Sequence, residues 1–117
     1  MEAFAWTGAP PPEIGDRETV ERLAERHVIV LGDDGAIRMA HPFAAHTDGA
    51  RVDAGGRTWW GNCAWDALGI VAALGLRDAT VTSTGVTLEV RAGRVRDDAI
   101  FHVLVPAREW WADIGFT

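Results

Sequence analysis

Several residue types that anchor folds or carry chemistry are scarce in this chain of 117 residues. Cysteine occurs once, which excludes an internal disulfide and a zinc site built from several cysteines; tyrosine is absent. No apolar run approaches the roughly 20 residues that a membrane-spanning helix needs. The N-terminus shows no basic region followed by an apolar core, so we expect no signal peptide and no membrane partner. These absences predict a cytoplasmic protein with a free thiol.

Basic charge is scarce as well. Eleven lysines and arginines stand against 17 aspartates and glutamates, giving a net charge of −6 and a pI near 5.0. This balance argues against a nucleic-acid partner, because such binding depends on neutralising phosphates with basic side chains. The length suits one small domain, and the sequence does not indicate its oligomeric state.

The first 45 residues contain the pattern of a helix followed by a β-hairpin. Asp16 can cap a helix whose apolar residues recur at helical spacing. Apolar runs at 28–31 and 36–39 flank a Gly-Asp-Asp-Gly turn. A helix followed by a hairpin is the second half of a winged helix. We therefore interpret residues 1–45 as a partial winged-helix-like segment and residues 46–117 as a single compact core.

The remaining residues predict an α+β fold in which an antiparallel sheet packs on one buried helix. Two short strands surround the Gly55-Gly56 turn, and ten of the next helix's twelve residues, 63–74, are apolar. Period-two alternation over 80–96 predicts an antiparallel meander. Residues 99–105 form a dense apolar run that we expect to be a central strand, and a helix should begin after Pro106.

The candidate chemistry lies at the start of the buried helix. Cys63 and Asp66 are three residues apart and so share a helix face. With Asn62 as N-cap, Cys63 would lie in the first turn, where the helix dipole favours a thiolate. Burial would raise the pKa of Asp66 and make it a proton donor, and a thiolate beside an acid suits soft-metal chemistry. The alternative is structural: a small buried hydrophobe and an ordinary first-turn acid.

Aromatic and histidine residues surround this pair in the sequence. Trp59, Trp60 and Trp65 flank the thiol and are candidates for a dry substrate pocket, although tryptophan clusters are more often plain core or interface. The remaining candidates are predicted to have structural roles. They are loop histidines with a minor option as metal ligands (His41, His46), a core histidine with a minor option beside Asp66 (His102), packing tryptophans (Trp110, Trp111) and strand hydroxyls without a catalytic partner (Thr82, Ser83).

Three segments carry a resemblance to a known family. They are GRTWWGNCAWDALGIVAALG (56–75), DDGAIRMAHPF (33–43) and FHVLVPAREWWADIGF (101–116). In collinear order they make residues 18–117 resemble the alkylmercury lyase (organomercurial lyase) family. The resemblance implies a winged-helix-like part followed by an antiparallel sheet with a buried helix. It also implies that Cys63 binds mercury, that Asp66 protonates the carbon leaving group, and that hydrocarbon and Hg(II) are released without a resident cofactor.

The chain departs from the family pattern in its thiols. The pattern has a second catalytic cysteine, expected just beyond residue 117, and often another in the strand after the buried helix, where Val81–Gly85 reads VTSTG. External thiols would then supply the missing ligand, or the chain is a truncated or specialised homologue. Two further hypotheses stay open: a relative redirected to another acid/base lyase or cyclisation reaction, and a non-catalytic module that binds soft metal through Cys63.

Overall fold

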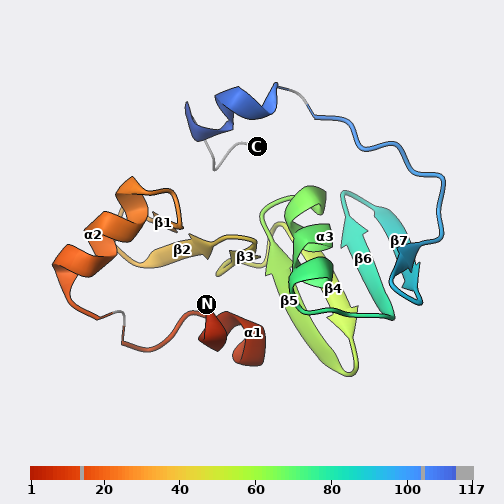
Figure 1. Ribbon diagram of the computed structural model, residues 1–117, viewed down its shortest axis with the longest axis horizontal. Helices are drawn as coiled ribbons and strands as arrows, with labels where there is room; N and C mark the ends of the chain where they lie inside the picture. The colour runs from red at the N-terminus through yellow and green to blue at the C-terminus, as the bar shows by residue number, and fades with distance from the viewer. Residues whose placement is uncertain (14, 104, 113–117) are drawn as a thin grey trace.

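The structure is a computed structural model and describes residues 1–13, 15–103 and 105–112. It contains two antiparallel sheets (Figure 1), which share one hydrophobic core. Its elements in chain order are α1 (Glu2–Thr7), α2 (Arg17–Glu25), β1 (Ile29–Leu31), β2 (Ile37–Ala40), β3 (Phe43–Ala44), β4 (Ala50–Ala54), β5 (Arg57–Gly61), α3 (Ala64–Ala73), β6 (Ala79–Ser83), β7 (Val86–Arg91), β8 (Arg94–Val95) and the 3₁₀ helix η1 (Ala107–Ala112). Among the described residues, no helix is long and apolar enough to cross a membrane.

The N-terminal part contains the predicted helix and hairpin. The Asp16 carboxylate caps α2 by accepting a hydrogen bond from the Thr19 N–H at 2.9 Å. β1 and β2 form the hairpin, and β3 adds a third strand. The short helix α1 was not expected, because its six residues carry no side-chain cap. The winged-helix interpretation of residues 1–45 stays a prediction.

The second sheet has the order β5-β4-β6-β7-β8, and every pair in it is antiparallel. Strand alternation gives it one apolar face, where Val52 lies opposite both Trp59 and Val81. α3 packs on β4, β5 and β6, and its Ile70 is fully buried. The predicted antiparallel sheet with a buried helix is therefore confirmed.

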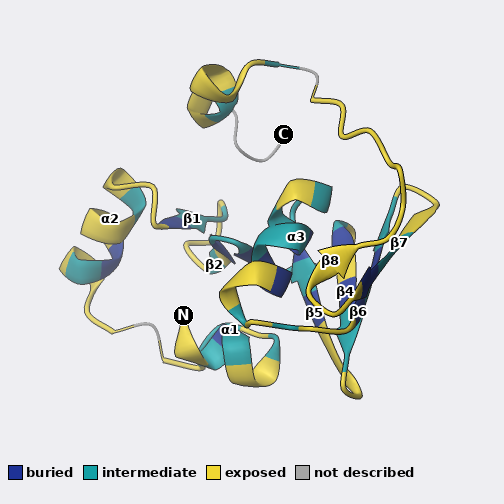
Figure 2. Cartoon of the chain, turned by 45° about the vertical axis from the view of Figure 1, so that its right-hand side comes forward, coloured by how far each residue is buried: buried dark blue, intermediate teal, exposed yellow. Residues whose placement is uncertain are grey.

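One hydrophobic core spans both sheets. It includes Phe4 and Val20 from the N-terminal helices together with Val52 and Ile70. Figure 2 shows the buried residues along the strands and on the inner side of α3. The core thus runs across the boundary predicted at residue 45, and that boundary stays a prediction.

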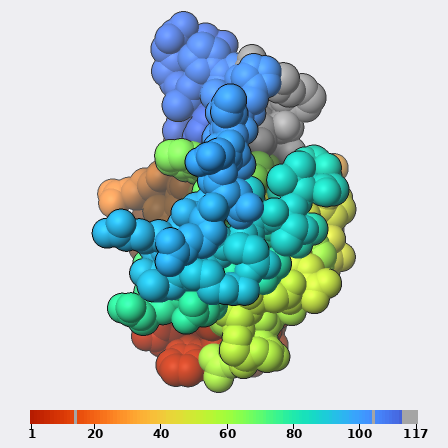
Figure 3. Space-filling model, turned by 90° about the vertical axis from the view of Figure 1, so that its right-hand side faces the viewer, coloured from red at the N-terminus to blue at the C-terminus, as the bar shows by residue number. Residues whose placement is uncertain are grey.

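The strand expected over residues 99–105 is wrong. The described residues of this segment form no strand, Ile100 is 93% exposed, and the middle position of the sheet belongs to β6. Its apolar side chains line a cavity instead of entering a sheet, and a hydrophobic run reads the same in either place. We call residues 97–103 and 105–112 the C-terminal arm; Figure 3 shows it rising away from the sheet. The helix expected after Pro106 is present as η1.

Candidate active site

A cavity of about 900 Å³ lies between α3, the far half of the sheet and the C-terminal arm. The start of α3 contributes one wall, β6 to β8 contribute a second, and the arm and two histidines complete it. The polar and aromatic residues of the lining include His27, His41, Cys63, Trp65, Asp66, Ser83, Asp97, Phe101, His102, Trp110 and Trp111. Most of the remaining lining is aliphatic, from α3, the strands and the arm, so the cavity is a predominantly apolar space.

The side chains of Cys63 and Asp66 are in contact at the N-terminal end of α3, as their spacing predicted. The Cys63 thiol donates to Oδ2 of Asp66 at a sulfur–oxygen distance of 3.7 Å. The N-cap is Cys63 itself, with an extended backbone (φ −140°, ψ 177°), and not Asn62. The helix therefore begins one residue later than expected, and the thiol is at the cap position instead of within the first turn.

The thiol is not activated in the way the sequence suggested. Burial raises the pKa of Cys63 above its ordinary value of 9.0, and the nearby Asp66 charge raises it further. Backbone N–H groups of Asp66 and Trp65 act in the opposite direction and lower the pKa, as expected at a helix start, but burial is the larger effect. Cys63 is therefore a protonated thiol at neutral pH until a ligand replaces its proton.

The carboxyl group of Asp66 behaves as expected. Burial raises its pKa above the ordinary 3.8, while the charge of His41 and hydrogen bonds from Cys63 and Asn62 lower it. Burial likewise lowers the pKa of His41 below 6.5, partly offset by the charge of Asp66. The site thus holds a thiol, a carboxyl group that retains its proton more readily than usual, and an imidazole that is uncharged near neutral pH.

Thiol alkylation gives a direct check on this electrostatic arrangement. The rate of Cys63 alkylation by iodoacetamide should rise with a midpoint above pH 9.0, because only the thiolate reacts. In Asp66→Asn the midpoint should fall, because a negative charge that opposes ionisation has gone. The chain unfolded in urea is the control, with the midpoint of a free thiol. A folded-state midpoint below that of the unfolded chain would contradict this account.

The three tryptophans predicted for the pocket do not lie together. Trp65 lines the cavity and lies against Phe101, with ring centroids 5.7 Å apart. Trp59 is a core residue, 4% exposed, whose indole N–H donates to the Ala5 carbonyl at 3.0 Å. Trp60 points to the opposite face of the sheet, since neighbouring residues of a strand alternate. Both belong to β5, the sheet edge farthest from the strands that wall the cavity, so neither lines it.

The histidines also differ from their predicted roles. His102 is exposed and lines the cavity, so it is not a core histidine. His41 lines the same cavity, whereas His46 is paired with Asp48 and is not among the lining residues. Sequence reasoning missed His27, whose ring stacks on Trp111 at 4.2 Å, and gave Trp111 no role beyond packing. Only the fold brings these rings together, and no local pattern signals it.

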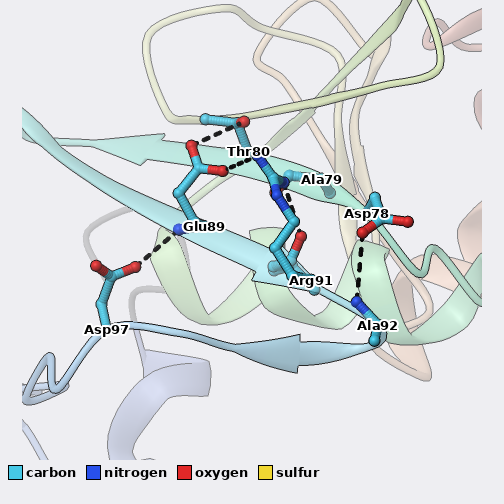
Figure 4. Close-up of polar contacts among 8 residues, drawn as sticks. Asp78, Ala79, Thr80, Glu89, Arg91, Ala92 and Asp97 are labelled. Atoms are coloured by element: carbon cyan, nitrogen blue, oxygen red, sulfur yellow. Dashed lines mark hydrogen bonds and ion pairs between the residues drawn. The ribbon is translucent and has the colours of Figure 1, made fainter.

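Polar contacts hold the start of the C-terminal arm against β7 (Figure 4). Asp97 accepts a hydrogen bond from the Glu89 N–H at 2.8 Å, and the Arg96 N–H donates to the Glu89 carbonyl at 2.9 Å. The Glu89 carboxylate in turn accepts from Thr80 at 3.3 Å and pairs with Arg91. The arm is thereby fixed at the point where it leaves the sheet, and its apolar residues are directed along the cavity.

The described residues contain no group of three or more His, Cys, Asp or Glu side chains placed to hold a metal ion. Cys63 is the one thiol in the sequence.

Comparison with known proteins identifies the family. The family model for alkylmercury lyase (MerB) matches residues 43–114, which include β3 to β8, α3 and most of the cavity lining. A crystal structure of the mercury-bound form of MerB2 is similar, with a TM-score of 0.54 and 30% sequence identity. The similarity covers 69% of this chain and 42% of that one, so this chain spans less than half of its length. No curated protein matches the chain. The match over most of the chain shows that it belongs to the alkylmercury lyase family.

Proposed function

We propose that this chain cleaves the carbon–mercury bond of an organomercurial, with Cys63 as the mercury ligand and Asp66 as the proton donor. Family membership supports the reaction class. The observation that carries the proposal is the 3.7 Å contact between the Cys63 thiol and the Asp66 carboxylate at the edge of an apolar cavity of about 900 Å³. A thiol that is already hydrogen-bonded to a carboxylate can pass its proton to that carboxylate when mercury binds to the sulfur.

The proposed reaction proceeds in two steps. The Cys63 sulfur displaces the exchangeable ligand of the organomercurial, and the thiol proton passes to Asp66. The carbon–mercury bond then breaks, its electron pair stays on carbon, and carbon takes the proton from Asp66. Mercury remains Hg(II) on the sulfur, so no electrons are gained or lost. The raised pKa of Asp66 supports this role, because its carboxylate takes up the thiol proton more readily than an ordinary carboxylate and holds it until carbon accepts it.

An external thiol completes the proposed cycle. Cys63 supplies one thiol and the sequence has no other, so removal of Hg(II) falls to thiolates from solution. Phenylmercury with excess monothiol is a suitable substrate, because the benzene released is readily measured by gas chromatography. We expect benzene release above the thiol-only rate for the wild type and none above it for Cys63→Ser. Benzene release by the wild type at only the thiol-only rate would refute the lyase proposal.

A capture module is the second candidate, and the sole cysteine favours it. In that case phenylmercury would bind to the wild type in a 1:1 complex that mass spectrometry detects with the phenyl group intact. Cys63→Ser would form no such complex. Capture without benzene release therefore supports this candidate over the lyase.

A further inference from the structure

The Nε2 atom of His41 is buried and has no hydrogen-bond partner among the described residues. Buried polar atoms are nearly always paired, because an unpaired one has lost its hydration without compensation. His41 lies on the wall of the cavity that Cys63 and Asp66 also line. An unpaired nitrogen at such a place calls for an explanation, and a ligand that completes the site is one.

The structure holds His41 firmly beside α3. The next residue, Pro42, packs on Gly69, where a Cβ atom would lie only 3.2 Å from the proline Cβ. Gly69 is one helical turn after Asp66, so this close approach brings the His41 loop to the part of α3 that carries the acid. The electrostatic interaction between His41 and Asp66 agrees with this position. On its other side the His41 ring meets Trp111 edge-on, with centroids 5.5 Å apart.

We propose that His41 is the second mercury ligand of this site, binding Hg(II) through Nε2 once carbon has left the Cys63-bound metal. Hg(II) favours two strong donors arranged in line, and the sulfur of Cys63 is one of them. When the carbon–mercury bond breaks, the metal loses its other donor, and the imidazole lone pair forms a nitrogen–mercury bond in its place. The oxidation state is unchanged, and the displaced carbon has already taken its proton.

Other donors on the cavity wall fit this role less well. Asp66 is an oxygen donor, which a soft metal binds weakly, and it is engaged with the thiol. The ring of His27 is stacked flat on Trp111, and His102 lies exposed on the C-terminal arm. His41 interacts electrostatically with Asp66, and among the described residues of the cavity wall only its Nε2 is a buried nitrogen without a hydrogen-bond partner.

The inference rests on the proposed role of Cys63, and its test uses Hg(II) alone so that it does not depend on bond cleavage. The full chain, labelled with ¹⁵N-histidine, is titrated with one equivalent of HgCl₂. We expect one Nε2 resonance to move strongly, and the resonance that moves should be the one missing from the spectrum of His41→Asn. If mercury binds the wild type and the His41 resonance stays in place, the inference is overturned, and this measurement requires no mutant to bind metal.

Competition with a monothiol supplies the second measurement. His41→Asn should lose its mercury at a monothiol concentration at least about tenfold lower than the wild type. The matched control is His46→Asn, which removes the other histidine with an unpaired buried Nε2 but lies off the cavity wall, and it should behave as the wild type. Equal retention of mercury by His41→Asn and wild type would overturn the inference.

The outcomes for the two proposals are separable. A sulfur–nitrogen mercury complex in a protein that releases no benzene would support the His41 inference and refute the lyase. Benzene release with no change in the His41 resonance would do the reverse. Mercury binding that survives in Cys63→Ser would overturn both, since the shared sulfur ligand would then be absent.

Discussion

Replacing Asp66 with asparagine should abolish most of the cleavage while making the protein more stable. Benzene release from phenylmercury should fall about 100-fold or more, because a positioned acid contributes on that scale and asparagine has no proton to give. Capture should persist, because Cys63 is unchanged. The intact phenylmercury complex should therefore accumulate and be visible by mass spectrometry.

The gain in stability follows from the raised pKa of Asp66. Below pH 3.8 the carboxyl group is protonated in the folded and the unfolded chain, so the wild type carries no penalty. As the pH rises through the folded-state pKa, the wild type loses stability, because the unfolded chain ionises more readily than the buried group. The Tm of Asp66→Asn should therefore exceed that of the wild type at pH 7, and the difference should vanish below pH 3.8.

Asp48→Asn is the control, because the pKa of Asp48 is shifted in the opposite direction to that of Asp66. The pKa of Asp48 is lowered, first by a hydrogen bond with its own backbone and then by His46, so its charged form stabilises the fold. This variant should not raise the Tm at neutral pH and should cleave normally. An Asp66→Asn protein with a lowered Tm at pH 7 would contradict the burial that we assign to this carboxyl group.

Adding a methyl group at Gly61, as in Gly61→Ala, should distort the site at the contact between β5 and the start of α3. A Cβ atom there would lie 2.8 Å from the Ala67 backbone nitrogen and 2.9 Å from the Asp66 Cβ. The first turn of α3 must move to accommodate it, since these atoms belong to the helix and its base. We expect Gly61→Ala to cost about 1–3 kcal/mol in the free energy of unfolding, with a Tm lower by at least about 5 °C.

Displacement of α3 should also separate the thiol from its acid. Alkylation of Cys63 in folded Gly61→Ala should then have a lower pH midpoint, and benzene release should fall. Gly69→Ala is the comparison: its Cβ would meet only the Pro42 side chain, at 3.2 Å, and alanine favours the helix. We expect its Tm to stay near that of the wild type. A normal Tm for Gly61→Ala would show that the close approach of β5 to α3 is looser than the distances indicate.

The sequence was most informative where the contacts are local. The three-residue spacing of Cys63 and Asp66 predicted their pairing, and the apolar run after them predicted a buried helix, because both follow from the repeat of one helix. The Asp16 cap was predicted for the same reason. The thiol's pKa was not, because it depends on how much of the chain covers the sulfur, and this is decided by segments remote from it.

Features that depend on strand order or on distant segments escaped prediction. Trp59 lies near the thiol in sequence, yet β5 is at the opposite edge of the sheet from the cavity. The rings of His41 and Trp111 are in contact although the two residues lie far apart in the sequence. No neighbouring residue in the sequence signals this contact. Residues 99–103 have the composition of a strand, but their apolar side chains face an open cavity, and composition alone does not distinguish the two.

The C-terminal arm gives the cavity a wall that is built separately from the reacting groups. Cys63 and Asp66 belong to a helix start that the core holds in place, whereas Phe101 and Val103 lie on a segment attached to the sheet near Asp97. Because the arm buries little, substitutions in it cost the fold little. In the proposed reaction, the organic groups that the cavity admits can therefore change through substitutions in the arm alone, while the thiol and the acid stay where they are.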